Sequence, residues 1–155
     1  MLTPIAPPLD IDLNTVDTSL PLIASGEIVD FQLFKIELKE TNKKDGLMLN
    51  IQHKSVSPTK SVKGETLNPG VFVFNNIMLN PIGKSTWEMV QRSIAELTQA
   101  AGLSTTLNDF INSGWKQLQG MNVKAKVSYI PEGPDKGGVI RKAKNEIAIY
   151  LKQGQ

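Results

Sequence analysis

Apolar and polar residues alternate through most of this chain, with the two-residue period that is typical of β-strands. The alternation predicts strands over residues 28–38, 47–53, 71–79, 121–129 and 146–152. Clusters of Gly, Pro, Asn and Asp separate these segments, as expected where a chain turns between strands. The pattern therefore predicts a mainly β domain.

The segment 28–38 is the longest of these strands, and the phase of its alternation changes in the middle. Val29, Phe31 and Leu33 share one face of the strand, and Phe34, Ile36 and Leu38 then continue the alternation on even-numbered positions. A one-residue slip in a period of two predicts a β-bulge or a sharp bend, and a bent strand can take part in two sheets at once. The polar turn that follows ends in Asp45-Gly46, a hairpin signal.

A helical period replaces the alternation between the third and fourth strands. The apolar stripe of this helix is Val90, Ile94, Leu97 and Ala101, with Trp87 at its head. Ser85 and Glu88 have the spacing of a capping box, which predicts that Ser85 caps the helix N-terminus. Gly102 is a suitable C-terminal stop. A shorter second helix is expected from Thr106 to near Gly114.

The resulting order of elements, β-β-β-α-β-β, is that of a five-stranded OB-fold-like barrel with a helical insert. We expect residues 22–155 to form this single domain, for which a chain of 155 residues is long enough. Residues 1–21 are rich in Pro and Asp, and we expect them to form an acidic N-terminal arm.

Charge is distributed unevenly between the two ends of the chain. Residues 1–30 hold five acidic residues and no Lys or Arg, a net charge of −5. Residues 31–155 hold all 17 basic residues and the other 10 acidic ones, a net charge of +7. Because a basic surface attracts polyanions, the domain is expected to bind an acidic partner.

The chain has no cysteine, which excludes a disulfide framework and thiolate chemistry and suits a reducing compartment. Its first residues lack the basic and apolar regions of a signal peptide. No apolar run approaches the roughly 18 residues that a membrane helix needs. We therefore expect a cytoplasmic protein.

The sequence offers little chemistry for catalysis. Gly83-Lys84-Ser85-Thr86 resembles the end of a phosphate-binding P-loop, but the glycine that this motif requires five residues earlier is Met78. His53 is the only histidine and ends a predicted strand, so we expect it at the surface. The acidic residues form no close pair. We expect no catalytic residues, no metal site and no cofactor, with nucleotide chemistry at Lys84 as the weaker alternative.

Two predicted loops of the barrel are basic, and in an OB-fold the loops after the first and fourth strands flank the face that holds oligonucleotides. The first loop carries Lys39, Lys43 and Lys44. The second carries Lys136, Arg141, Lys142 and Lys144. Lys124 and Lys126 add charge on one side of the fourth strand. These basic residues are candidates for contacts with phosphates.

Proteins that bind single strands combine a basic groove with aromatic rings that stack on bases. Most of the nine aromatic residues are expected in the core, where such rings are common. Phe72, Phe74 and Tyr129 are the candidates for stacking. The loops and rings together predict binding of single-stranded DNA with little sequence preference.

Several patterns of apolar residues and glycines occur together in this chain. They are residues 26–38, Lys43-Lys44-Asp45-Gly46 with residues 47–51, Phe72-Val73-Phe74, residues 94–103, Gly120 and Asn145-Glu146-Ile147. With them, residues 26–152 resemble a family of phage-encoded OB-fold proteins that bind single-stranded DNA. The resemblance implies a non-enzymatic role in phage-type replication or recombination, in the cytoplasm of the host cell.

One feature differs from many single-strand binders, which end in an acidic tail that recruits partners. Here residues 151–155 contain no acid, and the acidic segment is at the front of the chain. An alternative is therefore a protein-interaction or virion-associated structural domain, in which the N-terminal arm docks a partner. The sequence also leaves open a homo-oligomer and a preference for RNA.

Overall fold

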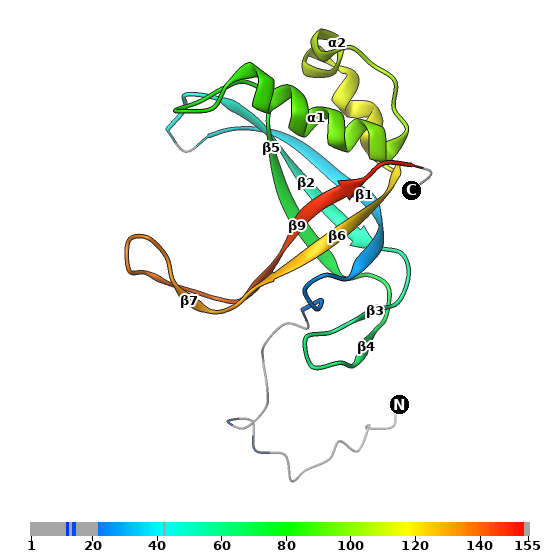
Figure 1. Ribbon diagram of the computed structural model, residues 1–155, viewed down its shortest axis with the longest axis vertical. Coiled ribbons are helices and arrows are strands. Elements are labelled where there is room, and N and C mark those ends of the chain that lie inside the picture. The colour runs from blue at the N-terminus through cyan, green and yellow to red at the C-terminus, as the bar shows by residue number, and fades with distance from the viewer. Residues whose placement is uncertain (1–11, 13, 15–21, 42, 154–155) are drawn as a thin grey trace, which may run out of the picture.

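The computed structural model describes residues 12, 14, 22–41 and 43–153 (Figure 1). The predicted N-terminal arm therefore lies outside the described residues, apart from residues 12 and 14. The long strands are β1 (Ile28–Glu40), β2 (Leu47–Ser55), β5 (Phe72–Met78), β6 (Asn122–Ile130) and β9 (Lys144–Leu151). They form one antiparallel sheet in the order β5-β2-β1-β6-β9. The predicted mainly β architecture is confirmed, with each predicted strand present.

Shorter elements complete the fold. β3 (Thr59–Lys60) pairs with β4 (Thr66–Leu67), and β7 (Gly133–Pro134) pairs with β8 (Ile140–Arg141). The helices are α1 (Trp87–Ala101), α2 (Leu107–Asn112) and the 3-10 helix η2 (Gly114–Leu118). Neither α-helix in the described part of the chain has the length and apolar character that crossing a membrane requires.

β1 is common to the two halves of the sheet. Its segment 28–32 pairs with β6, and its segment 31–40 pairs with β2. The register against β2 shifts between Leu33 and Lys35, which confirms the predicted bulge and leaves Phe34 as the extra residue. Because of this bulge, Phe34 and Lys35 are both exposed although they are neighbours in a strand.

α1 lies across one end of the curved sheet and contacts β5, β6 and β9 (Figure 1). The predicted apolar stripe is buried against the sheet, but Trp87 at its head is half exposed. Gly102 ends the helix in the left-handed conformation with φ 75°, as predicted.

The predicted N-cap at Ser85 is wrong, because the cap is Thr86. The Thr86 hydroxyl accepts a hydrogen bond from the Met89 amide at 3.3 Å. The Ser85 side chain is already engaged in the preceding turn, where its hydroxyl accepts a hydrogen bond from the Ile82 amide and donates one to the Ile82 carbonyl oxygen, both at 2.8 Å. Either the Ser85 or the Thr86 hydroxyl could cap the helix, and the conformation of the turn leaves only the Thr86 hydroxyl available to do so.

β5 and β9 stand at the two ends of the strand order and do not pair, so the sheet is open along this seam. A buried polar bridge joins its two sides. The Tyr150 hydroxyl on β9 lies 2.7 Å from Nε2 of His53 on β2 and accepts a hydrogen bond from Nδ2 of Asn75 on β5 at 3.0 Å. Side chains thus connect strands that the backbone leaves unpaired.

His53 is completely buried, so its predicted place at the surface is wrong. Nδ1 lies 3.0 Å from the carbonyl oxygen of Val73, which can only accept, so Nδ1 donates and Nε2 accepts the Tyr150 proton. Burial lowers the pKa of the His53 imidazole from 6.5 to about 4. The ring is therefore neutral at pH 7 and acts as a structural bridge.

Candidate nucleic-acid interface

The outer face of β1, β2 and β5 carries three exposed phenylalanines. In the register of the sheet, Lys54 on β2 lies opposite Phe72 on β5, and Gln52 lies opposite Phe74. Side chains alternate along these strands, so these four point away from the core, whereas His53 and Val73 between them point into it. The bulge adds Phe34 to the same region. We call Phe34, Gln52, Lys54, Phe72 and Phe74 the aromatic face.

Phe34 and Phe72 come from strands 38 residues apart in sequence, yet their rings make an edge-to-face pair with centroids 5.5 Å apart. The Lys54 ammonium lies 5.1 Å from the Phe34 centroid and 6.0 Å from that of Phe72. No acidic side chain among the described residues forms an ion pair with Lys54. The arrangement holds a positive charge at the edge of an apolar surface.

Phe74 is the most exposed of the three rings, at 55%, against 45% for Phe34 and 42% for Phe72. Exposed aromatic side chains that lie together mark interaction surfaces more often than single ones do. Phe74 has no ring partner in the described part of the chain, so its face is open to a ligand. Phe74 is therefore the most accessible of the candidate stacking rings.

Amide side chains continue the same face beyond the rings. Nδ2 of Asn50 on β2 donates to Oδ1 of Asn76 on β5 at 2.8 Å. The pair leaves an amide oxygen on Asn50 and an N–H group on Asn76 with no partner in the described part of the chain. A donor and an acceptor side by side can bond to the edge of any base.

The outward residues of β1 add charge beside this face. Glu37 lies between two lysines, with Oε1 2.6 Å from Lys35 Nζ and Oε2 3.5 Å from Lys39 Nζ. The hydrogen bond and charge of Lys35 are the largest cause that lowers the pKa of the Glu37 carboxyl. The candidate contact residue Lys39 therefore shares an acidic partner with Lys35 on the outer face of β1.

The first basic loop is the turn between β1 and β2. Lys43 and Lys44 in this turn are exposed. Lys44 has a positive φ of 55°, which reverses the chain direction toward Gly46 and β2. The turn and the β7–β8 hairpin both leave the body on the left side of Figure 1.

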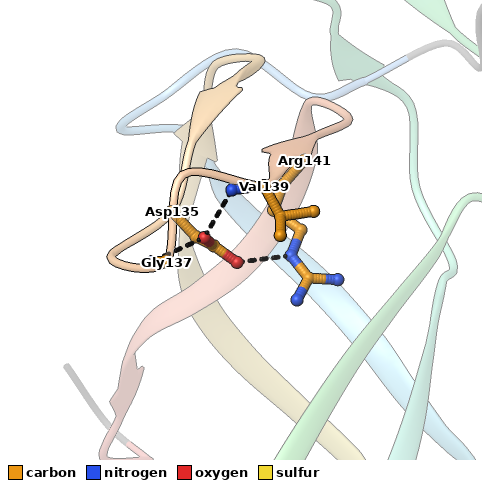
Figure 2. Close-up of polar contacts among 4 residues, drawn as sticks. All are labelled: Asp135, Gly137, Val139 and Arg141. Carbon is orange, nitrogen blue, oxygen red and sulfur yellow. Dashed lines mark hydrogen bonds and ion pairs between the residues drawn. The ribbon is translucent and has the colours of Figure 1, made fainter.

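The second basic loop is not irregular but forms the β7–β8 hairpin. Asp135 organises it: Oδ1 accepts hydrogen bonds from the backbone amides of Gly137 and Val139 at 2.9 and 3.0 Å, and Oδ2 lies 2.9 Å from Nε of Arg141 (Figure 2). The Arg141 hydrogen bond is the largest cause that lowers the pKa of Asp135. The predicted phosphate ligand Arg141 is therefore already engaged by an acid.

The other basic residues of this hairpin differ in their surroundings. Lys144 forms an ion pair with Glu146 at 3.0 Å. Lys136 and Lys142 are exposed and have no acidic partner among the described residues. Of the predicted hairpin contacts, these two are the most available to a phosphate.

The candidate contact residues on β6 lie outside the aromatic face, because β1 lies between β6 and β2 in the sheet. These residues are Lys124, Lys126 and Tyr129. Lys124 lies 3.8 Å from Asp30 on β1, and Lys126 is exposed on the same strand. Tyr129 is half-buried near the base of the hairpin. Phe72 and Phe74 are thus the two predicted stacking residues that meet on one face.

Sequence reasoning missed Phe34, Gln52 and Lys54 as members of this site. The signal for Phe34 was the change of phase, because the extra residue of a bulge can turn outward. Lys54 follows from the alternation of β2, in which Asn50 and Gln52 already point outward. What no local pattern gives is that these residues meet Phe72.

Other kinds of site lack support in the described ranges. No group of three or more His, Asp or Glu side chains is placed there to hold a metal ion. Comparison of the sequence with protein-family models finds no match, and comparison with curated proteins finds none either. The aromatic face therefore rests on the geometry of its own residues.

Proposed function

We propose that this protein binds single-stranded DNA without catalysis and with little sequence preference, through the aromatic face. The observation that carries the proposal is the exposed ring pair of Phe34 and Phe72, with Lys54 over both rings and Phe74 open beside them. Base–aromatic stacking contributes about 1–3 kcal/mol per base and tolerates every base, because each has a π-face. A duplex hides these faces, so the site favours single strands.

The strand order supports an OB-fold-like barrel as the architecture behind this site. Helix α1 follows the third long strand, and β1 pairs with both β2 and β6, as such a barrel requires. OB-folds hold oligonucleotides on their second and third strands. In this chain those strands are β2 and β5, which carry four of the five residues of the aromatic face.

Phosphate contacts supply the remaining affinity in this proposal. Lys54 and Lys35 lie beside the rings, and Lys43, Lys44, Lys136 and Lys142 lie in the two loops. Because neither stacking nor phosphate contacts read base identity, little sequence preference is expected. A role in phage-type replication or recombination completes the proposal and rests on the resemblance described above.

Fluorescence anisotropy with labelled oligo-dT tests the proposal. The protein should bind at about 50 mM salt, and the affinity should fall as salt rises because counterions are released. Phe74→Ala should weaken binding by roughly ten-fold, since it removes one stacking platform.

Trp87→Ala is a matched control, because Trp87 is an aromatic residue on α1 that is also half exposed, at 49%. This variant should bind as the unmodified protein does. Absence of binding at 50 mM salt, or equal losses in the two variants, would refute the proposal.

A further inference from the structure

The β7–β8 hairpin projects away from the sheet as a narrow arm (Figure 1). Two apolar side chains on this arm are exposed, Val139 at 54% and Ile140 at 62%. Residues 131–144 hold four basic and two acidic residues, a net charge of +2. The arm therefore combines exposed apolar groups with positive charge and contributes none of the buried apolar residues of the core.

The end of this arm is held in one conformation. The Asp135 carboxylate bonds to two backbone amides and to Arg141, as Figure 2 shows. Backbone hydrogen bonds from Asp135 N to Val139 O at 2.9 Å and from Gly138 N to Asp135 O at 3.0 Å close the turn. Gly138 has a φ of 80°, which other residues adopt rarely. Little conformational entropy is left to lose when such an arm binds a ligand.

Val139 directly precedes β8, which begins at Ile140, and successive side chains along an extended backbone point to opposite sides. Ile140 on β8 pairs with Pro134 on β7, and the Val139 carbonyl oxygen accepts a hydrogen bond from the Asp135 amide on the other side of the hairpin. The hairpin is thus a thin ribbon with an apolar group on each side. A ribbon of this kind can contact two flat apolar surfaces at once.

The neighbouring charges indicate which ligand presents such surfaces. Lys136 and Lys142 flank the apolar pair and have no acidic partner in the part of the chain that the structure describes. Nucleic acid offers flat apolar bases joined by anionic phosphates. Proteins that kink nucleic acids insert aliphatic side chains between base steps in this way, and each unstacked step costs a few kcal/mol.

We propose that the hairpin inserts Val139 and Ile140 between neighbouring bases of the bound strand and unstacks that step. Lys136 and Lys142 hold the phosphates on either side. The inference rests on the proposed function, and it adds that binding disrupts base stacking beyond the aromatic face. The hairpin then acts as a wedge, and Asp135 is the positioning residue that keeps it stiff.

The test uses a single strand with 2-aminopurine between adenines, because the fluorescence of this base rises when it unstacks. At saturating protein the signal should rise several-fold, and Val139→Ser combined with Ile140→Ser should remove at least half of the rise. Val62→Ser is the matched control, because Val62 is 47% exposed in the turn between β3 and β4. This control should keep the full signal.

Anisotropy measured on the same samples separates the two proposals. Binding of the strand with an equal fluorescence rise in the double variant overturns the wedge and leaves the proposed function standing. Absence of binding overturns the proposed function itself. If the double variant instead loses binding to vesicles of anionic lipid while its fluorescence rise is unchanged, the apolar pair serves a membrane surface, and the wedge is wrong.

A second variant tests the role of Asp135 without touching the apolar pair. Asp135→Ala removes the three hydrogen bonds of the carboxylate and should reduce the fluorescence rise while both apolar residues remain. Lys136→Gln keeps the carboxylate cluster and should change affinity at low salt more than it changes the fluorescence at saturation. An unchanged signal in Asp135→Ala would show that stiffness of the arm is not needed.

Discussion

Nε2 of His53 lies 2.7 Å from the hydroxyl oxygen of Tyr150, and this hydrogen bond joins β2 to β9 across the open side of the sheet. The two rings stack, with centroids 5.6 Å apart and an interplanar angle of 27°. Asn75 on β5 donates to the same hydroxyl, so three strands meet at one oxygen. Because the His53 and Tyr150 side chains are buried, neither has water as an alternative partner, and each depends on the other for its hydrogen bond.

Tyr150→Phe is expected to destabilise the fold by about 1–3 kcal/mol, because it leaves Nε2 of the buried His53 without a partner and removes the acceptor of the part-buried Asn75 amide. Urea unfolding followed by circular dichroism measures this loss as a lower midpoint. Tyr129→Phe is the control, since the Tyr129 hydroxyl makes no hydrogen bond to any described residue, and its midpoint should stay unchanged. Equal midpoints for the two variants would contradict the bridge.

Stability is expected to fall as the pH drops from about 6.5 toward 4. The imidazole of His53 has a pKa of about 4 in the folded protein, against 6.5 as its ordinary value. Between these values the unfolded chain binds the proton and the folded protein does not, so acid favours unfolding. The full effect is about 3 kcal/mol, and it is absent above pH 7.

Urea midpoints at pH 7.5, 6 and 5 measure this dependence. The range avoids the carboxyl groups of Glu37 and Asp135, whose lowered pKa values place their titration in more acidic solution. In His53→Gln the decline between pH 7.5 and 5 should largely disappear. A midpoint that stays constant over this range in the unmodified protein would rule out a buried neutral histidine.

Lys54→Gln should weaken oligo-dT binding and make it less sensitive to salt. Removing one phosphate contact lowers the slope of log affinity against log salt by about 0.7 for a single strand. Lys116→Gln is a matched control, because the Lys116 ammonium also lies over a ring, 5.7 Å from the centroid of Trp115, but away from the aromatic face. If both variants keep the original slope, Lys54 contacts no phosphate.

Glu37→Gln should tighten oligo-dT binding, since it releases Lys35 and Lys39 from the acid between them. With two more lysines available, the salt slope should rise by up to about 1.4. Glu88→Gln, which breaks the Glu88–Arg92 ion pair on α1, is the control and should leave binding unchanged. Unchanged binding by Glu37→Gln would place the strand away from β1.

The sequence by itself determined the features that repeat over a few residues. The alternation marked the five long strands, its slip at Phe34 marked the bulge, and Gly102 marked the helix end. These predictions succeed because burial of one face imposes a period on the residues of each element. The periodic pattern did not distinguish Ser85 from Thr86 as the N-cap, because the conformation of the preceding turn determines which hydroxyl reaches the helix amides.

Only the tertiary structure decided which residues from different strands meet. The aromatic face gathers Phe34, Lys54 and Phe72 because the sheet register places β1, β2 and β5 side by side. The sequence predicted His53 at the surface, but in the fold it is buried and hydrogen-bonded to Tyr150, which is 97 residues away in sequence. Such contacts depend on register and on strand order. The periodic pattern of one strand cannot predict these contacts, because each polar or aromatic residue contacts a partner on another strand.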